Sequence, residues 1–238
     1  ATPPEVVTTA VAGVQSWESV LTAVGTLEAV QGVTVTAELS GKVVQIDLTA
    51  GSKVKAGDLL VKQDTSTEEA QLRSAEAAAI LARLNMERFG KLLAERTIAQ
   101  SQYDNAEAAF KQAVAQADTI RAAIAKKTIR APFAGRIGLR LVNLGQVVNA
   151  GDPIVSLQSL DPIYVNFSLP QQQLPQIRPG LGVRVSGDAL PGGLVEGRVT
   201  AINPQVDAAT RNIRIQATVA NPEERLRPGM FENSDCSC

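Results

Sequence analysis

Two cysteines are the only residues whose type and spacing suggest metal binding in this chain. Cys236 and Cys238 form a C-x-C pair within the last three residues. A closed zinc site takes about four ligands, and histidine, the other common ligand, is absent from the sequence. A disulfide framework is also disfavoured, because its cysteines would be spread through a small fold. We therefore predict no metal and no cofactor, and we interpret the polar tail ENSDCSC, residues 232–238, as disordered or non-native sequence.

Composition narrows the possible functions further. The lack of histidine disfavours acid–base catalysis, because histidine is the commonest general base near neutral pH. The net charge is −1 and there is no basic run, which argues against nucleic acid as a partner. No segment approaches the roughly 18 apolar residues that a membrane helix needs. The 238 residues can hold one large domain or a few small ones.

A duplicated glycine pattern indicates how the chain is organised. The segments ELSGKVVQIDLTAGSKVKAGDLLV, from Glu38, and PFAGRIGLRLVNLGQVVNAGDPIV, from Pro132, share their glycines and a Gly-Asp pair at the same spacing. The shared positions are Gly41, Gly51, Gly57 and Asp58 in the first copy and Gly135, Gly145, Gly151 and Asp152 in the second. Short apolar runs predict strands, and the glycines predict tight turns between them. Because so small a β unit cannot bury its apolar face alone, we predict that the two copies pair into one sandwich.

The residues between the copies, 65–127, predict an antiparallel pair of helices. They contain no proline and many good helix formers, and Thr65 to Glu69 offer a capping box at the start. Apolar residues then recur at steps of three and four, which is the pattern of a coiled coil. The two seams are Leu72, Ala75, Ala79, Ala82, Met86, Phe89 and Leu93, and then Tyr103, Ala106, Phe110, Ala113, Ala117, Ile120 and Ile124. The turn is predicted around residues 96–100, about 45 Å from the sandwich.

A long, thin hairpin buries little surface and carries no catalytic chemistry. We therefore expect it to span a distance or to dock onto a partner protein. Arg88 and Leu92 lie off the seam near the predicted turn, four residues apart on one helix face. They could form a docking patch for a partner. The alternative is a solvated arginine beside a leucine that merely flanks the coiled coil. Periodicity alone leaves both interpretations open.

The remaining segments predict an antiparallel β-barrel fed from both ends of the chain, from residues 15–31 and 162–231. Turn clusters such as Leu190 to Gly193 separate its strand-like runs. We interpret Asp207 to Arg211 as a structural turn that leads into a strand. The predicted fold is an elongated multidomain α+β protein, in which a split β-sandwich carries a helical hairpin beside an antiparallel barrel.

Several segments together resemble the periplasmic adaptor subunits, or membrane fusion proteins, of tripartite resistance–nodulation–division (RND) efflux pumps. Besides the two repeats, they are IRAPFAGRIG at 129–138, LDPIYVNFSLP at 160–170, INPQVDAATRNIRI at 202–215 and NPEERLRPGMF at 221–231. The resemblance implies a lipoyl-like domain in two halves, 32–64 and 128–161, and a remnant of a membrane-proximal domain at 1–14. It implies no enzymatic activity.

The resemblance also implies partners and a location. Such an adaptor bridges an inner-membrane proton-driven transporter and a TolC-type outer-membrane channel, and it assembles as a hexamer. We expect a periplasmic protein associated with the inner membrane through an anchor outside this chain, serving the export of drugs or other small toxic compounds. The family continues past residue 231 into further strands, so we expect the membrane-proximal domain to be absent or disordered and the chain to be a fragment or an altered form.

The family's channel-docking motif implies a role for the hairpin tip. The motif is an arginine, a leucine four residues later and a serine seven residues after that. Arg88 and Leu92 match the first two positions, but Ala99 occupies the third. Alanine cannot cap the second helix, so we expect capping to pass to Thr97 with Gln100 or to Ser101 with Asp104.

Two other functions fit parts of the pattern. Adaptors of ABC-type secretion or efflux systems share the lipoyl and hairpin plan, although their hairpins are often longer. Biotinyl or lipoyl carrier domains share the duplicated β unit, and they carry a modified lysine in the turn between its halves. Here the coiled coil occupies that point, and neither Gln63-Asp64 nor Thr128-Ile129 supplies a lysine.

Overall fold

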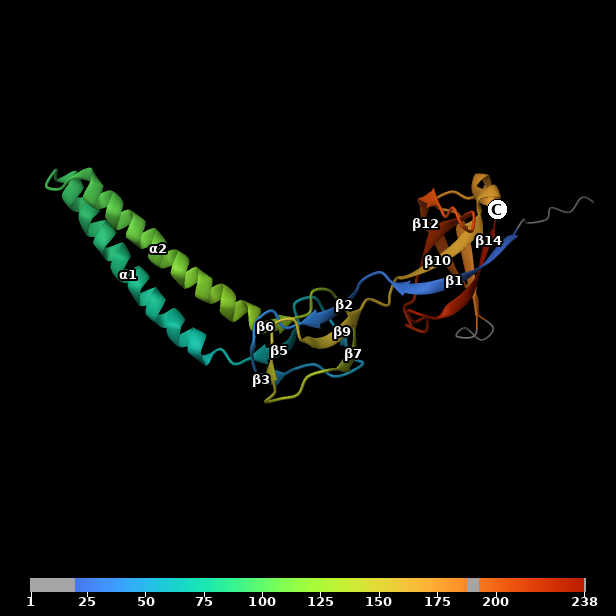
Figure 1. The fold of residues 1–238 in the computed structure, drawn as a ribbon, viewed down its shortest axis with the longest axis horizontal. Helices are drawn as coiled ribbons and strands as arrows, with labels where there is room; N and C mark the ends of the chain where they lie inside the picture. The colour runs from blue at the N-terminus through green and yellow to red at the C-terminus, as the bar shows by residue number, and fades with distance from the viewer. Residues whose placement is uncertain (1–19, 188–192, 238) are drawn as a thin grey trace, which may run out of the picture. The chain divides into compact units, whose positions relative to one another are not determined.

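The computed structural model describes residues 20–187 and 193–237, which form two compact units (Figure 1). One unit combines residues 20–30 with residues 160–187 and 193–237, and the other spans Gln31–Ser159. A helical hairpin, a split sandwich and an antiparallel barrel are all present, so the predicted fold class is confirmed. The strand expected within residues 1–14 lies outside the described residues.

The sandwich consists of two four-stranded sheets, each of which takes strands from both copies of the repeat. The first half, residues 32–64, supplies β2 (Gly32–Thr36), β3 (Gly41–Ile46), β4 (Lys53–Val54) and β5 (Leu59–Gln63). The second half, residues 128–161, supplies β6 (Thr128–Arg130), β7 (Gly135–Arg140), β8 (Val147–Val148) and β9 (Pro153–Gln158). The strand orders are β2-β9-β7-β4 and β6-β5-β3-β8. The copies therefore interleave, and neither forms a complete sheet by itself.

The core of the sandwich lies between these sheets and draws on both copies. Val43 and Leu60 come from the first half and Ile154 and Leu157 from the second, and all four side chains are fully buried. Such interdigitated apolar burial, at roughly 25 cal/mol per Å², is the main favourable term for a small β unit. The two copies are held together by this shared core as well as by their strand pairing.

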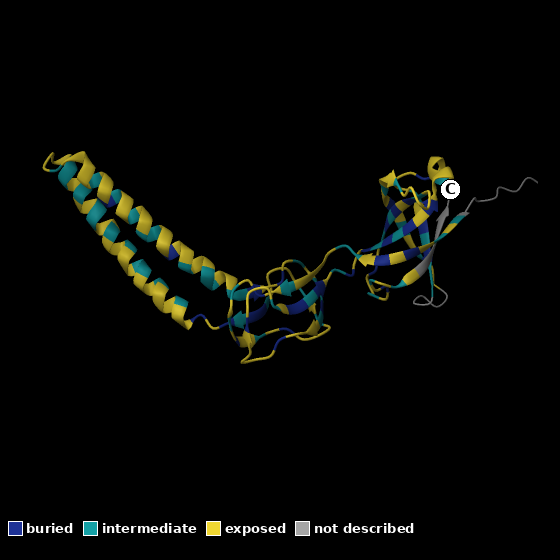
Figure 2. Cartoon of the chain, viewed as in Figure 1, coloured by how far each residue is buried: buried dark blue, intermediate teal, exposed yellow. Residues whose placement is uncertain are grey.

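The hairpin consists of α1 (Ser66–Ala94) and α2 (Gln100–Lys126), drawn in teal and green in Figure 1. Every predicted seam residue is at least half-buried, and Ala106 and Ala117 are buried. The outer faces are exposed, as Figure 2 shows. Glu107 and Lys111, four residues apart on α2, form an ion pair at 2.8 Å. Small alanines at the seam allow the two helices to lie close together along their length.

Both feet of the hairpin are fastened at one place on the sandwich. β5 pairs with β6, and the Gln63 amide donates to the Lys127 carbonyl at 2.9 Å. Lys127 Nζ donates to Glu68 at 2.5 Å and to the Asp64 carbonyl at 3.1 Å. The expected capping box does not form, because Thr65 donates to the Glu69 carboxylate and the Asp64 carboxylate accepts from the Ser66 amide instead.

Acidification is expected to loosen these feet. The hydrogen bond from Lys127 lowers the pKa of Glu68 below its ordinary value of 4.5. The carboxylate therefore stabilises the fold above pH 4.5, and this contribution is lost as the pH falls through the lowered pKa. Urea unfolding followed by circular dichroism should show a smaller loss of stability on acidification for Glu68→Gln than for the unaltered chain.

A nearby exposed pair provides the control. Lys126 and Glu38 lie 3.8 Å apart with both side chains more than half exposed, and such pairs contribute about 0–1 kcal/mol. Glu38→Gln is expected to leave the acid sensitivity almost unchanged. If Glu68→Gln were as acid-sensitive as the unaltered chain, the partly buried pair would not be its source.

The second unit is a closed antiparallel barrel in the order β1-β10-β13-β12-β11-β14. Its strands and one short 3-10 helix, η1, are β1 (Val20–Ala29), β10 (Ile163–Pro170), η1 (Gln171–Gln176), β11 (Gly182–Ser186), β12 (Val195–Val206), β13 (Asn212–Val219) and β14 (Phe231–Ser237). Buried and exposed residues alternate along β10 and β13 (Figure 2). Phe167, Ile215 and Leu226 are among the residues that fill its interior.

The expectation that the C-terminal tail is disordered was wrong for residues 232–237, which the structure describes. Residues 231–237 form β14, which pairs with β1 on one side and with β11 on the other and so closes the barrel. The physical reason is that strand pairing uses backbone groups, which the polar residues of this tail supply as well as apolar ones do. Without β14, the edges of β1 and β11 would both be left unpaired.

The described residues contain neither a membrane-spanning helix nor a cluster of metal ligands. No helix there combines the length and the apolar character that crossing a membrane requires. No group of three or more metal-ligating side chains comes together there either.

Candidate functional site

The hairpin tip is formed by the end of α1, the turn at residues 95–99 and the start of α2. Arg88 and Leu92 lie on one face of the last turns of α1, where Arg88 is exposed and Leu92 is half-buried. Ala99 is exposed and precedes the first residue of α2. The structure thus brings all three sequence-predicted positions to the same end of the hairpin.

Backbone hydrogen bonds define the turn. The Arg96 amide donates to the Leu93 carbonyl at 2.9 Å, and the Thr97 amide donates to the Leu92 carbonyl at 3.0 Å. This pair of bonds is a Schellman motif, which requires a left-handed residue just past the helix end. Arg96 occupies that position with φ 59°. The end of α1 is therefore closed by the backbone of Arg96 and Thr97.

Capping of α2 differs from the expectation. Ala99 is the N-cap residue and has extended backbone angles, φ −76° and ψ 148°. Neither Thr97 nor Ser101 takes over the role of a side-chain cap. The Thr97 hydroxyl donates backward to the Leu92 carbonyl at 2.8 Å, because the turn aims it at the end of α1. Gln100 donates to Asp104 instead of supporting a cap.

The tip also presents positive charge. Arg88, Lys91 and Arg96 are exposed, and the described residues offer none of them an ion pair. Farther down the hairpin, Arg121 is paired with Glu76 at 2.7 Å and with Asp118 at 2.6 Å. Sequence reasoning missed Arg96. Its signal was the lack of a glycine among residues 95–99, just past the end of α1, which leaves another residue to take the left-handed position.

An apolar groove runs along one side of the hairpin below the tip. It has a volume of about 490 Å³ and is lined by Ala78, Leu81, Ala82, Asn85, Phe89, Gln102, Asn105, Ala106 and Ala109. Leu81, Ile80 and Leu84 on α1 expose between 49% and 61% of their surface. The shaft of the hairpin therefore has apolar surface that its own two helices do not cover.

The repeated turns lock the two halves of the sandwich onto each other. Gly51, Gly57, Gly145 and Gly151 all adopt left-handed angles, with φ between 78° and 92°. The Gly57 amide donates to Ala131 at 2.8 Å, and in the other copy the Gly151 amide donates to Ala37 at 2.7 Å. Each of these two turns thus bonds to the backbone of the other half.

The two aspartates repeat this symmetry. The Asp58 carboxylate accepts from the Lys55 amide at 2.7 Å, and the Asp152 carboxylate accepts from the Asn149 amide at 2.7 Å. Each carboxylate therefore closes its own turn. The remaining glycines differ from the prediction, because Gly41 and Gly135 begin β3 and β7 and are not in tight turns. Their lack of a side chain matters for close packing against Gln63 and Gln158.

Lys127, where the insert rejoins the second half, is not presented to solvent as a cofactor-carrying lysine would be. Its side chain is only 12% exposed, and its ammonium is engaged by Glu68 and Asp64. A lysine that carried a cofactor would have to project from a tight turn into solvent. The geometry at the feet of the hairpin instead supports a role for Lys127 in anchoring the hairpin to the sandwich.

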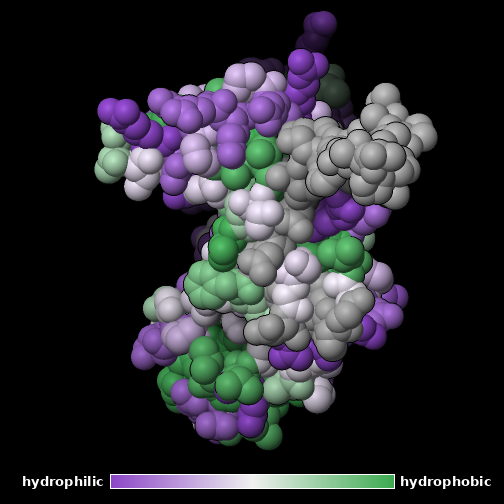
Figure 3. Space-filling model, turned by 90° about the vertical axis from the view of Figure 1, so that its right-hand side faces the viewer, coloured by the Kyte–Doolittle hydropathy of each residue, from purple (hydrophilic) through white to green (hydrophobic). Residues whose placement is uncertain are grey.

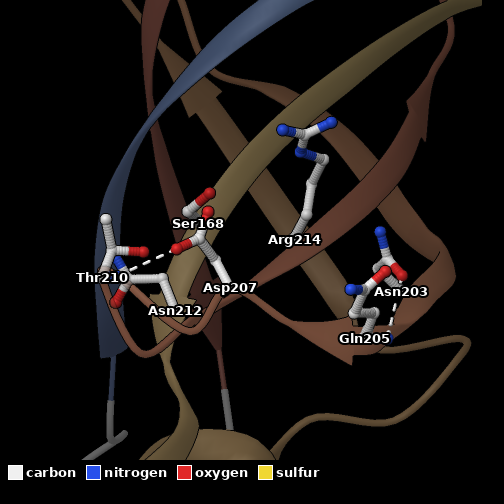
Figure 4. A pocket seen from close by; sticks show the side chains of 7 residues that line it. All are labelled: Ser168, Asn203, Gln205, Asp207, Thr210, Asn212 and Arg214. Carbon is white, nitrogen blue, oxygen red and sulfur yellow. Dashed lines mark hydrogen bonds between the residues drawn. The ribbon is translucent and has the colours of Figure 1, made fainter.

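The barrel carries a polar pocket of about 260 Å³ on its surface, shown in Figure 4. Asp207 accepts from the Ala209 and Thr210 amides at 2.9 Å each, and the bonds from Thr210 and Ala209 lower its pKa. Asp207 faces Thr210, while the guanidinium of Arg214 lies apart from them (Figure 4). Asp207 thus organises the turn into β13, which agrees with the structural interpretation of residues 207–211.

The sandwich also exposes large apolar side chains around β7 and β8. They are Leu139, Leu141, Leu144 and Val147, which expose between 54% and 78% of their surface. Figure 3 shows that hydrophobic side chains gather on part of the face it presents, beside strongly hydrophilic areas. Like the groove on the hairpin, the exposed apolar side chains around β7 and β8 offer area for contacts with other proteins.

Known proteins share this combination of domains. A family profile described as "RND MFP, barrel-sandwich hybrid domain" matches residues 31–158, and one described as "CusB-like, beta-barrel domain" matches residues 162–237. An uncharacterized protein of Haemophilus influenzae is 34% identical over 91% of this chain and 57% of its own length. Multidrug resistance protein MdtA of Proteus mirabilis is 33% identical over 90% of this chain and 57% of its own length. The chain thus spans little more than half the length of these curated relatives.

Solved structures share the fold. A crystallised MacA–MexA chimeric protein, containing the Pseudomonas aeruginosa MexA alpha-hairpin domain, superposes with a TM-score of 0.80 at 24% identity, over 93% of this chain and 83% of its own. The membrane fusion protein Spr0693 of Streptococcus pneumoniae superposes with a TM-score of 0.71 at 20% identity, over 92% of this chain and 98% of its own. At these identities the likeness concerns the fold.

Proposed function

Because this chain belongs to the membrane fusion protein family of RND efflux systems, whose members are non-enzymatic periplasmic adaptors, we propose that it links an inner-membrane proton-driven RND transporter to a TolC-type outer-membrane channel. Drug export is the proposed task, and its support is the likeness to proteins named for multidrug resistance. The proposed location is the periplasm, at the inner membrane.

The observation that carries this proposal is the anchored hairpin. Both of its feet are fixed to one side of a small sandwich by the pairing of β5 with β6 and by Lys127. Helices of 29 and 27 residues then place the tip about 45 Å away. A rigid projection with an exposed tip suits a structural link between two other proteins, and Arg88 with Leu92 is the proposed contact for the channel.

Self-association as a hexamer is part of the proposal. The apolar groove beside Leu81 and Phe89 and the exposed leucines of the sandwich supply surface on which neighbouring copies could pack. Exposed apolar patches of a few hundred Å² commonly mark protein–protein contacts. Packing of neighbouring hairpins would also align several tips for one channel.

Arg88→Glu is expected to weaken capture of a TolC-type channel while leaving the fold intact. The reversal of charge at an exposed position puts repulsion where attraction is proposed, and it removes no buried contact. Capture is measured by pull-down of the purified channel, and folding by circular dichroism. A loss of about tenfold in affinity or more is expected for one reversed contact.

Arg73→Glu is the matched control, because Arg73 is an exposed arginine of the same helix near its foot. It should capture the channel as the unaltered chain does. Equal capture by Arg88→Glu and the unaltered chain would refute the proposed tip contact. A loss of capture by Arg73→Glu equal to that of Arg88→Glu would point to a general charge effect.

A further inference from the structure

We propose that Arg96 is a third channel-contact residue, which acts with Arg88 to bind carboxylates on the periplasmic end of the outer-membrane channel. This inference rests on the proposed function, since it names a further contact at the same tip. The family's motif assigns the third position to residue 99, which is alanine here. Arg96 would supply the polar contact that Ala99 cannot make.

The backbone conformation of Arg96 is the first observation. Its φ of 59° lies in the left-handed region, at the residue that follows the C-terminal cap of α1. Glycine is the residue that suits this position, because any side chain meets its own carbonyl there. The turn therefore gains nothing from an arginine. Strained residues of this kind are enriched at functional positions, although Arg211 adopts the same conformation in a structural turn.

The surroundings of the side chain are the second observation. The turn is closed by the backbone amides of Arg96 and Thr97 and by the Thr97 hydroxyl, all of which bond to the Leu92 or Leu93 carbonyl. Within the described chain, the guanidinium of Arg96 has no hydrogen bond or ion pair, and the residue is exposed. Its charge is thus available to a partner without cost to the fold.

The charge balance of the tip indicates the chemistry of the partner. Between Arg88 and Ala99 the chain has three cationic side chains, Arg88, Lys91 and Arg96, against the single carboxylate of Glu95. Arginine forms two parallel hydrogen bonds with a carboxylate, which gives both strength and direction. A channel end that presents aspartate or glutamate side chains fits this tip, and one that presents cations would be repelled.

Arg96→Gly separates a structural role from a contact role, because the two roles predict opposite outcomes. A structural role predicts that glycine, which suits the left-handed angle, maintains or improves both folding and capture. The proposal predicts that the thermal unfolding midpoint stays the same or rises, while the affinity for an immobilised TolC-type channel falls about tenfold. Arg96→Lys keeps the charge and should recover part of that loss.

Arg211→Gly is the matched control for this experiment. Arg211 is also an exposed arginine with left-handed backbone, φ 55°, but it lies in the barrel. Its replacement should leave capture of the channel unchanged. Capture should also become less sensitive to added salt in Arg96→Gly, because one screened charge pair has been removed.

The outcomes distinguish this inference from the proposed function. If Arg88→Glu loses capture while Arg96→Gly keeps it in full, the role of Arg96 is overturned and the adaptor function stands. If both variants keep capture in full, the tip contact falls as a whole. If Arg96→Gly loses capture and Arg96→Lys recovers none of it, the charge-based reading of the contact is overturned.

Discussion

Gly135→Ala is expected to destabilise the sandwich by about 3 kcal/mol, at the upper end of the usual cost of overpacking. A Cβ atom on Gly135 would lie 2.5 Å from the carbonyl oxygen of Gln158 and 2.9 Å from its carbon. These are backbone atoms of β9, which is hydrogen-bonded on both sides by β2 and β7. The clash can therefore be relieved only by moving a central strand.

The equivalent position in the other copy provides the comparison. A Cβ on Gly41 would first meet the side chain of Gln63, whose Oε1 would lie 3.0 Å away. That oxygen is buried without a hydrogen-bond partner, so its displacement breaks no bond, although Nε2 of the same side chain is bonded to Leu39. We expect Gly41→Ala to cost only about 1 kcal/mol, the centre of the range for single substitutions. Urea unfolding that gave equal losses for the two variants would contradict this account.

Leu157→Ala is expected to cost about 2–5 kcal/mol, the range for a buried leucine that leaves a cavity. Leu157 is fully buried in the core that both sheets share, so neighbouring side chains from both copies would lose contacts. The loss should appear as faster amide hydrogen exchange throughout β9 and its neighbours β2 and β7, and as a lower denaturation midpoint.

Leu139→Ala is the control for this substitution. Leu139 lies in β7 of the same sheet but exposes 78% of its surface. An exposed position of this kind usually changes stability by less than about 0.5 kcal/mol. Should Leu139→Ala destabilise the sandwich as much as Leu157→Ala does, the assignment of the core would be wrong.

The sequence predicted those features that depend on periodic patterns. The glycine spacing identified the paired copies, and the steps of three and four from Leu72 to Ile124 identified both seams of the hairpin. These patterns are reliable because burial on one face of a helix or strand constrains many residues at once. The position of the tip residues Arg88 and Leu92 followed from the same periodicity.

Features that depend on one backbone bond or one angle could not be predicted. The polar tail forms β14 because it pairs with the free edges of β1 and β11. Those edges are set by residues far from the tail in sequence, so the tail's own pattern does not reveal them. The Thr97 hydroxyl turned toward Leu92 because of the left-handed angle at Arg96, which composition does not reveal. The close approach at Gly135 likewise involves Gln158, which no local pattern connects with it.

The interleaving of the two copies has a consequence for how the protein folds. The strands of the sandwich that must pair, such as β5 with β6, are separated in the chain by the whole of the hairpin. Closing so long a loop by chance is entropically costly, and non-local pairing of this kind is slow. The hairpin can form progressively from its tip, where the two helices are closest in sequence, and its completion brings the ends of β5 and β6 together. Formation of the hairpin would thus also promote the pairing of β5 with β6, the strands that anchor it to the sandwich.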